Sequence, residues 1–361
     1  MKAQSIERIK SLDGLRAISI LLVLISHSFR GIKYYIDIGN LGVRMFFIIS
    51  SYLIAGILLR DVIKNKFSIK TFYFKRLMRT FPAFYFYLGF LALILLITDH
   101  FDWSQFWYSP IYLENYHPRS LWNENQWFTG HTWSLAVEEQ FYLLIAILFA
   151  FYNKKKIDLK KLTYILIFIV FAVPIIRLTY MTINEIPSVL KGSIHRSFET
   201  VADSLAVGAI FAILKDKIEI SKIYKLLSKA IPLMIVFIFV VVYLNSSAAV
   251  SQFGHISRFF YNSLGIFLVN ACLGLIMLRS INVSSSSVLS KVLNFKPLVF
   301  LGLLSYSIYL WQQLWLFGWE FNLGFKWLGI AMCSLISYYL IEEKFLKIRD
   351  RILLRRKDVI S

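Results

Sequence analysis

The segment LDGLRAISILLVLISHS (residues 12–28) decides the fold class, because its long apolar centre is typical of a membrane-spanning helix. It nevertheless contains Arg16 near one end and His27 near the other, and ionisable side chains at membrane depth are costly. His27 follows Arg16 by eleven positions. Helical geometry therefore places both on one face, within about 20° and roughly 16 Å apart along the axis. This face could line a cavity. Alternatively, Arg16 could reach the inner headgroups and His27 could be a hydrogen-bonded core residue.

The composition is that of an integral membrane protein, with 58% hydrophobic and 17% aromatic residues in a chain of 361. The net charge of +19 comes largely from basic segments between apolar stretches, so it requires no nucleic acid. Cys272 and Cys333 both lie in apolar runs, which argues against a disulfide framework or a thiolate metal site, and we expect no metal. No small-residue cleavage site follows the first apolar segment, so we expect this segment to be retained rather than removed as a signal peptide.

Apolar stretches of spanning length predict an all-α integral membrane protein with about ten transmembrane helices. We expect a single membrane domain over residues 1–361, because no stretch is long enough for a soluble domain. The predicted spans cover residues 12–29, 40–59, 82–97, 134–152, 162–180, 198–214, 230–245, 259–278, 298–317 and 325–343.

The segments between these spans alternate in charge. Residues 60–79, 153–161 and 215–225 are basic, whereas 98–127 contains four acidic residues and one arginine. The positive-inside rule therefore predicts that both termini are cytoplasmic, including a short basic tail at 344–361. The basic segments are also expected to contact anionic lipids of the bilayer.

The basic segment FYFKRLMRTFP (residues 72–82) contains a compact cationic cluster just before Pro82 begins a predicted span. Arg76 and Arg79 are neighbours on one helical turn, and Lys75 adjoins them. Guanidinium groups suit phosphate recognition in fork geometry. The alternative is an ordinary basic loop that fixes orientation.

The segment HTWSLAVEEQFYLL begins another span and carries polar residues at helical spacing. His131, Ser134 and Glu138 fall on one helix face, and a glutamate at this depth is expected to face the bundle interior. Glu138 and His27 could then act as orienting acid and base for a hydroxyl. Alternatively, Ser134 could cap the helix and Glu138 could be solvated. Neither G-x-S-x-G nor a metal-ligand spacing occurs, which disfavours a serine hydrolase and a metal site.

Two further features are assigned structural roles. Gly39 and Gly42 are expected to let helices approach closely. Arg177 and Asp203, in separate predicted spans, are expected to form an ion pair with each other.

Taken in order, these motifs resemble the membrane acyltransferase-3 family, ten-span bacterial enzymes of the inner (cytoplasmic) membrane that O-acylate envelope glycans and other acceptors. The resemblance covers nearly the whole chain and begins with the family's Arg-x10-His, here Arg16 and His27. It implies acyl-CoA, most often acetyl-CoA, as the cytoplasmic donor. The later motifs are GVRMFFIISSYLI, FYFKRLMRTFP, WSLAVEEQFYLL, DSLAVGAIFA, LSYSIYLWQQL and YYLIEEKFLK.

The resemblance implies roles for individual residues. His27 becomes the catalytic histidine, either a general base or a transient acyl carrier, and Arg16 its partner on the donor path. Glu138 belongs to the family's outward-facing motif and is expected to orient His27. The implied donor-binding residues are Lys75, Arg76 and Arg79, and the implied acceptor-binding residues are Trp133, Ser134 and Tyr142.

The chain departs from the family pattern at several positions. Ser51 stands where relatives often have glycine, Gln312 where a late histidine is common, and Lys344 where many have proline. Any role of the late histidine is therefore expected to be absent. We expect no SGNH-type esterase domain after the last span, so transfer is expected in the membrane domain or through a separate partner.

Two other functions remain open from the residues alone. A transporter or glycan flippase also uses many spans and intramembrane charges, although we find no inverted repeat. A purely structural protein of an envelope assembly would have little need for Arg16, His27 and Glu138 at these depths.

Overall fold

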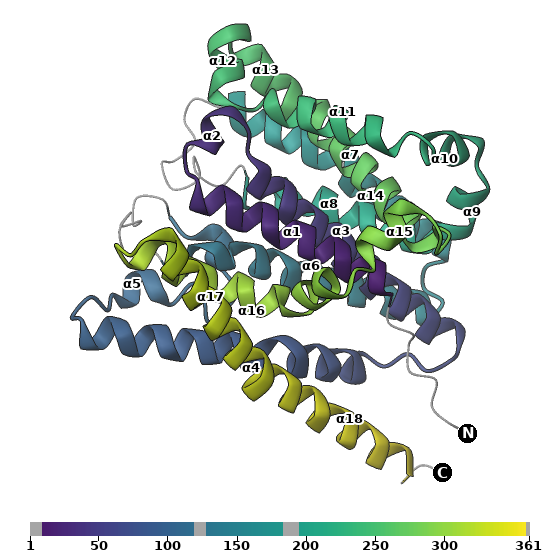
Figure 1. Cartoon of the computed structure of the whole chain (residues 1–361). Helices are drawn as coiled ribbons and strands as arrows, with labels where there is room; N and C mark the ends of the chain where they lie inside the picture. Colours follow the sequence, from purple (N-terminus) through teal and green to yellow (C-terminus); the bar gives the residue numbers. More distant parts are fainter. Residues whose placement is uncertain (1–8, 119–127, 183–194, 359–361) are drawn as a thin grey trace.

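The computed structural model describes residues 9–118, 128–182 and 195–358, and these residues form helices joined by turns and loops (Figure 1). The all-α prediction is thereby confirmed for the described chain. The first helices are α1 (Lys10–Ser28), α2 (Ile32–Tyr35), α3 (Ile38–Ile63), α4 (Ile69–Ile97), α5 (Trp103–Phe106), α6 (Trp133–Asn153), α7 (Leu159–Thr182) and α8 (Phe198–Ile213). They are followed by α9 (Lys215–Ile220), α10 (Lys222–Leu227), α11 (Ile231–Tyr243), α12 (Ser247–Phe253), α13 (His255–Phe260), α14 (Ile266–Asn282), α15 (Val288–Leu293), α16 (Lys296–Gly318), α17 (Leu323–Ser337) and α18 (Glu343–Asp358).

Each of the ten predicted spans coincides with a helical segment. By length and composition, seven described helical stretches could cross a membrane, or eight if the bent pair α11 and α12 forms one span. The protein is thus a multi-pass membrane protein. The figure of ten stays a prediction, because α8 has only 16 residues, fewer than the roughly 17–25 of a usual span.

The helix α4 differs from its predicted span. It begins at Ile69, where the Ser68 hydroxyl accepts a hydrogen bond from the Thr71 amide at 3.2 Å, and it continues through Pro82. Ser68 supplies the N-terminal cap that the first turn requires. The basic segment at 72–82 is therefore the first half of a long helix rather than a loop.

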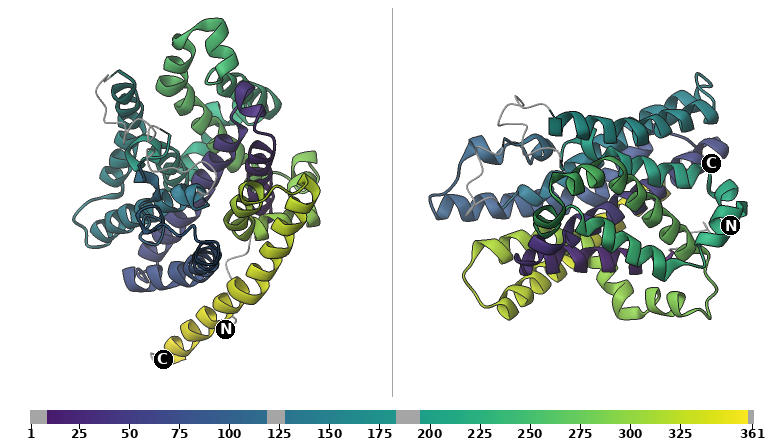
Figure 2. Two further views of the ribbon diagram at one scale, coloured as in Figure 1. Left: turned by 90° about the vertical axis from the view of Figure 1, so that its left-hand side faces the viewer. Right: turned by 90° about the horizontal axis from the view of Figure 1, so that it is seen from above.

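Helix α1 lies inside the bundle, packed against α3 and α16, while α3 also packs against α8 (Figures 1 and 2). Glycines permit this closeness. A Cβ atom at Gly42 would lie 2.5 Å from the carbonyl oxygen of Ser19, and one at Gly39 would lie 2.8 Å from the Ser26 hydroxyl. The expected role of these glycines in close helix packing is confirmed.

The basic segments of the sequence, such as residues 60–79, 215–225 and 344–357, gather at one end of the bundle (Figure 1). The start of α1, the turn from α3 to α4, and α9, α10 and α15 lie at one end, toward the right of Figure 1. The end of α18 lies on the same side. We call this basic end the inner end and the opposite end the outer end. Its assignment to the cytoplasm stays a prediction.

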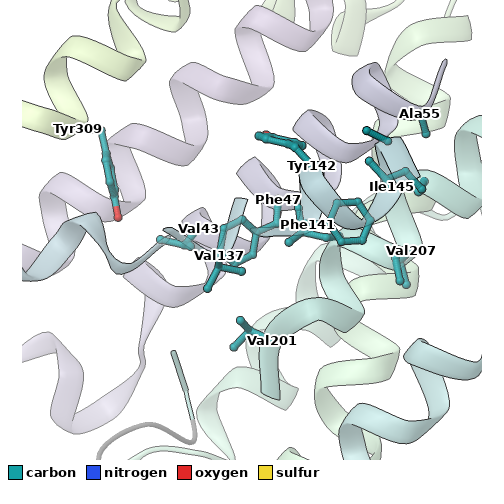
Figure 3. Close-up of a cluster of buried hydrophobic side chains, with 14 of the residues drawn as sticks. Val43, Phe47, Ala55, Val137, Phe141, Tyr142, Ile145, Val201, Val207 and Tyr309 are labelled. Carbon is teal, nitrogen blue, oxygen red and sulfur yellow. The ribbon is translucent and has the colours of Figure 1, made fainter. Parts of the chain in front are cut away.

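The centre of the bundle is apolar. Val43 and Phe47 of α3, Val137 and Phe141 of α6, and Val201 of α8 are all buried in one hydrophobic cluster (Figure 3). This cluster fixes α6 against α3 and α8, and so sets the depth at which the polar residues of α6 lie.

Candidate active site

His27 faces a cavity of about 550 Å³ at the outer end of the bundle. Its Nδ1 lies 2.9 Å from Oε1 of Gln312 on α16, and its ring meets Phe317 edge-on at 5.7 Å. Because a carbonyl oxygen can only accept, Nδ1 carries the hydrogen and donates it to Gln312. Nε2 is then the unprotonated nitrogen of the neutral ring, and it has the lone pair that a general base needs.

His131 lines the same cavity and is an electrostatic neighbour of His27. It is buried, and its Nε2 donates a hydrogen bond of 3.0 Å to the Leu310 carbonyl. The carbonyl oxygen of His131 in turn accepts from the Tyr309 hydroxyl at 2.7 Å. His131 is therefore tied to α16 at both backbone and ring, which holds the start of α6 at the depth of His27.

Ser134 connects this outer region to the next turn of α6. Its hydroxyl lies 2.7 Å from the Tyr309 hydroxyl. Since Tyr309 donates its hydrogen to the His131 carbonyl, Ser134 donates to Tyr309. Trp133 lines the cavity and packs edge-on against Phe47 at 6.0 Å. Trp133 thus lines the cavity that His27 faces, whereas Ser134 contacts α16 through Tyr309.

The expected pairing of Glu138 with His27 is wrong. Glu138 Oε2 accepts hydrogen bonds from Arg76 at 3.2 Å and from Tyr142 at 2.7 Å. The physical reason is helix rise: Glu138 follows His131 by seven residues, which places it about 10 Å further along α6 toward the inner end. Gln312 occupies the orienting position on His27 instead.

Arg76 is the centre of an inner polar cluster. Besides Glu138, its Nε donates to Glu139 Oε1 at 3.1 Å, and its guanidinium lies 4.0 Å above the ring of Tyr142. The Tyr142 hydroxyl also lies 2.6 Å from that of Ser50. Tyr142, expected at the acceptor, therefore belongs to this cluster, and Arg76 already contacts two carboxylates.

Two further arginines complete the cluster. Arg79 interacts electrostatically with Arg16, Arg76 and Glu342, and Glu342 accepts a hydrogen bond from Ser307. Arg79 and Lys75 have exposed side chains, whereas Arg76 is largely covered. We call Arg16, Arg76, Arg79, Glu138, Glu139 and Glu342 the inner ionic cluster, in which Arg76 forms the ion pairs with Glu138 and Glu139. Arg16 thus lies at the inner ionic cluster and His27 at the outer cavity. Both side chains point into the bundle, as their position on one face of α1 predicts.

A third polar network lies behind the outer cavity. Arg177 donates to Asp203 at 2.9 Å, so the predicted ion pair is confirmed. Arg44 also approaches Asp203, at 3.8 Å, and it donates to Ser204 and to Asn40. These side chains are buried, except for Asn40, which lines the cavity. Two guanidinium groups therefore share one carboxylate beside the site.

Sequence reasoning missed Arg44, Glu342 and Gln312 as members of these sites. Gln312 gave a signal, because it stands where relatives often have histidine. Glu342 lies within YYLIEEKFLK and Arg44 within GVRMFFIISSYLI, so both stand in motifs that were noted for their resemblance. No spacing on their own helices indicated which partner each would meet.

The described chain is thus a multi-pass bundle of helices with polar sites in its interior. A histidine lines the cavity at the outer end, and an ionic cluster lies toward the inner end. Residues 9–341 match the family described as an acyltransferase domain, and the chain belongs to this family, acyltransferase-3.

The relatives are bacterial O-acetyltransferases. The chain is 30% identical over 338 residues to the peptidoglycan O-acetyltransferase OatA of Listeria monocytogenes, a match covering 84% of this chain and 49% of that protein. It is 27% identical over 328 residues to the O-acetyltransferase OatA of Staphylococcus aureus strain NCTC 8325, covering 86% of this chain and 51% of that protein. The chain therefore spans about half the length of these relatives. No solved structure matches it significantly.

Proposed function

We propose that the chain is a membrane-bound O-acetyltransferase of the bacterial cytoplasmic membrane, which moves an acetyl group from cytoplasmic acetyl-CoA to a hydroxyl of an envelope glycan. Membership of the acyltransferase-3 family and the O-acetyltransferase names of the relatives support this reaction class. The observation that carries the proposal is the hydrogen bond from His27 to Gln312, because it leaves Nε2 unprotonated on a residue that lines the cavity.

In the proposed reaction, Nε2 of His27 removes the proton from the acceptor hydroxyl while the oxygen attacks the acetyl carbonyl carbon. The new ester bond forms as the carbon–sulfur bond breaks. The imidazolium then returns the proton to the departing thiolate, so coenzyme A leaves as a thiol. Gln312 orients the ring but, as a neutral amide, takes no proton. In a variant of this route, Nε2 first accepts the acetyl group and then passes it to the acceptor.

We propose that Arg79 and Lys75, with exposed side chains at the inner end, hold the phosphates of the donor. Arg76 was expected to share this role. Its two carboxylate partners instead favour a positioning role for Arg76, in which it fixes Glu138 and Glu139. Among the described residues, no hydrogen-bond partner contacts the buried Nε of Arg16. We assign Arg16 to positioning of the thioester arm, because it lies roughly 16 Å from His27 along α1, too far to stabilise charge that develops there.

The transporter or flippase alternative is less well supported, because family membership favours an acyltransferase. It would require movement of a solute across proteoliposomes in the absence of an acyl donor. Solute movement without acetyl transfer would replace the proposed function with this one.

The test is acetyl transfer by the purified protein in vesicles loaded with radiolabelled acetyl-CoA, combined with mass spectrometry of envelope glycans from cells. His27→Ala should lower transfer by at least about 100-fold, since a positioned general base contributes roughly 10²- to 10⁴-fold. His255→Ala is the matched control, because His255 is an exposed histidine on the short helix α13. Near-normal transfer by folded His27→Ala protein would remove His27 from the reaction.

A further inference from the structure

The cavity that His27 faces is lined by an excess of cationic side chains. Arg30, Lys33 and Arg196 all border it, while Asp37 is the acidic residue of its described lining. Arg30 lies over the ring of Phe317, with 4.5 Å from its guanidinium carbon to the ring centroid, and the same ring contacts His27. Arg30 and His27 thus share Phe317 as an aromatic partner, which holds the Arg30 guanidinium on the same side of the cavity as His27.

The negative charge of Asp37 is already engaged. Asp37 is the N-cap of α3, and its Oδ1 accepts a hydrogen bond of 3.1 Å from the Asn40 amide. A carboxylate at a helix N-terminus is stabilised by the unpaired amides and by the helix dipole. Asp37 is thus oriented toward its own helix, and among the described residues it forms no ion pair with Arg30 or Lys33.

A second excess of positive charge lies directly behind the cavity wall. Asn40 lines the cavity and accepts a hydrogen bond of 2.8 Å from Nε of Arg44. Arg44 and Arg177 share the carboxylate of Asp203, so this buried network carries one net positive charge. A buried charge of this kind extends its field further than an exposed one, because the surrounding protein screens it poorly.

We propose that the acceptor is an acidic glycan, whose carboxylate or phosphate group is held by Arg30 and Lys33 while a nearby hydroxyl meets His27. The identity of the bound molecule as an acceptor rests on the proposed function. The cavity volume of about 550 Å³ lies within the usual range for pockets that bind small ligands. Arginine and lysine are the side chains that recognise carboxylates and phosphates, so a neutral sugar would leave these cations unused.

The experiment compares three closely related sugars by isothermal titration calorimetry with the whole protein in a neutral, non-sugar detergent. N-acetylglucosamine is the neutral probe, N-acetylmuramic acid adds a carboxylate, and N-acetylglucosamine 1-phosphate adds a phosphate. We expect at least one acidic sugar to bind about tenfold more tightly than the neutral one at low salt. The acidic sugar that binds more tightly identifies carboxylate or phosphate as the recognised group.

Variants test whether the named cations are responsible. The double substitution Arg30→Gln and Lys33→Gln should reduce the acidic preference by about 3- to 10-fold, and Arg30→Lys should retain most of it. The double substitution Lys154→Gln and Lys155→Gln, at exposed positions just after α6, removes the same number of positive charges and should leave the preference unchanged. Added salt should weaken the binding of the acidic sugar more than that of the neutral one.

Equal binding of all three sugars would overturn the inference, as would an acidic preference that survives the double substitution unchanged. Because binding requires no acyl donor, the result is independent of acetyl transfer. Acidic preference in a protein that transfers no acetyl group would refute the proposed function but retain the anion site. Acetyl transfer without any preference for acidic sugars would retain the proposed function but refute the anion site.

Discussion

Arg76 of α4 and Glu138 of α6 form an ion pair of 3.2 Å in the helix bundle, where both side chains are largely covered. This contact joins two helices that are separated by more than thirty residues of intervening chain. It also determines which of the bundle's arginines remain available to a ligand. The pair therefore links the stability of the fold to the chemistry of the proposed donor site.

Arg76→Ala should destabilise the protein strongly, because it leaves Glu138 and Glu139 without their shared cation. Breaking a buried ion pair typically costs about 3–5 kcal/mol. The measurement is the Tm of the purified protein in detergent. Adding Glu138→Gln and Glu139→Gln to Arg76→Ala should recover part of the loss, since the unpaired negative charges are then removed. An Arg76→Ala protein with the wild-type Tm would show that the cluster does not hold the helices together.

Arg79→Ala should raise the KM for acetyl-CoA by about tenfold, with a smaller change in kcat, because a phosphate contact is made equally in the ground state and the transition state. Arg79→Lys should give an intermediate KM, since a single ammonium replaces the fork of the guanidinium. Lys66→Ala, at an exposed position in the turn between α3 and α4, is the control. A lower kcat at unchanged KM would place Arg79 in the chemistry rather than in donor binding.

Gln312→Glu should move the acid limb of the rate profile to higher pH. A carboxylate beside His27 stabilises the protonated ring, so a higher pH is needed before Nε2 is free to act as a base. Gln312→Leu should instead lower kcat by about 10- to 100-fold at all pH values, because the ring loses its orienting partner. The pH–rate profiles of the two variants distinguish an orienting role of Gln312 from a purely structural role. In a purely structural role, both substitutions would lower kcat and neither would shift the acid limb of the profile.

His117 provides a prediction about stability and pH. This residue lies in the outer loop after the short helical turn at 114–116, and burial, reinforced by the charge of Arg196, lowers its pKa from 6.5 to about 4. Below pH 6.5 the unfolded chain takes up a proton that the folded protein refuses. The folded state should therefore lose stability as the pH falls from about 6.5 toward 4. His117→Gln should make Tm less dependent on pH over this range, whereas His100→Gln, at an exposed position, serves as the comparison. An unchanged pH dependence in His117→Gln would contradict this assignment.

Gly208→Ala tests the closest contact between α3 and α8. A Cβ atom at position 208 would overlap the Ser51 hydroxyl and the Ile48 carbonyl oxygen. We expect a loss of stability of about 1–3 kcal/mol, as for other overpacked cores. Gly56→Ala is the matched control on α3, because no heavy atom lies within 4 Å of its Cβ position. There the substitution should be neutral or slightly stabilising, since alanine favours a helix. Equal effects at both positions would rule out steric overlap as the cause.

Local pattern was sufficient for much of the fold. Apolar length located the helices. The 3.6-residue period predicted one face for His131, Ser134 and Glu138; His131 lies in the short turn at 130–132 just before α6, and all three contact polar partners. The pairing of Arg177 with Asp203 also followed from charge alone, because two buried opposite charges have few other ways to be stabilised.

The partners of the remaining polar residues could not be predicted in the same way. The contact from His27 to Gln312 joins positions 285 residues apart, and it depends on how deeply α16 sits against α1. Likewise, the contact of Glu138 with Arg76 depends on α4 continuing through Pro82 with its basic half inside the bundle. The depth of one helix relative to another is set by tertiary packing. It therefore cannot be predicted from the spacing of residues within a single helix.

The hydrogen bond between Ser134 and Tyr309 lies on the route between the outer cavity and the inner ionic cluster. Around it, Val137, Phe47 and Phe141 are buried in the apolar centre (Figure 3). A water-filled passage here would let protons and salt leak across the membrane and dissipate the gradients that power the cell. The tight packing at this depth excludes a continuous column of water. In the proposed reaction the thioester arm must therefore displace side chains here and fill the space itself, which keeps the bilayer impermeable to ions.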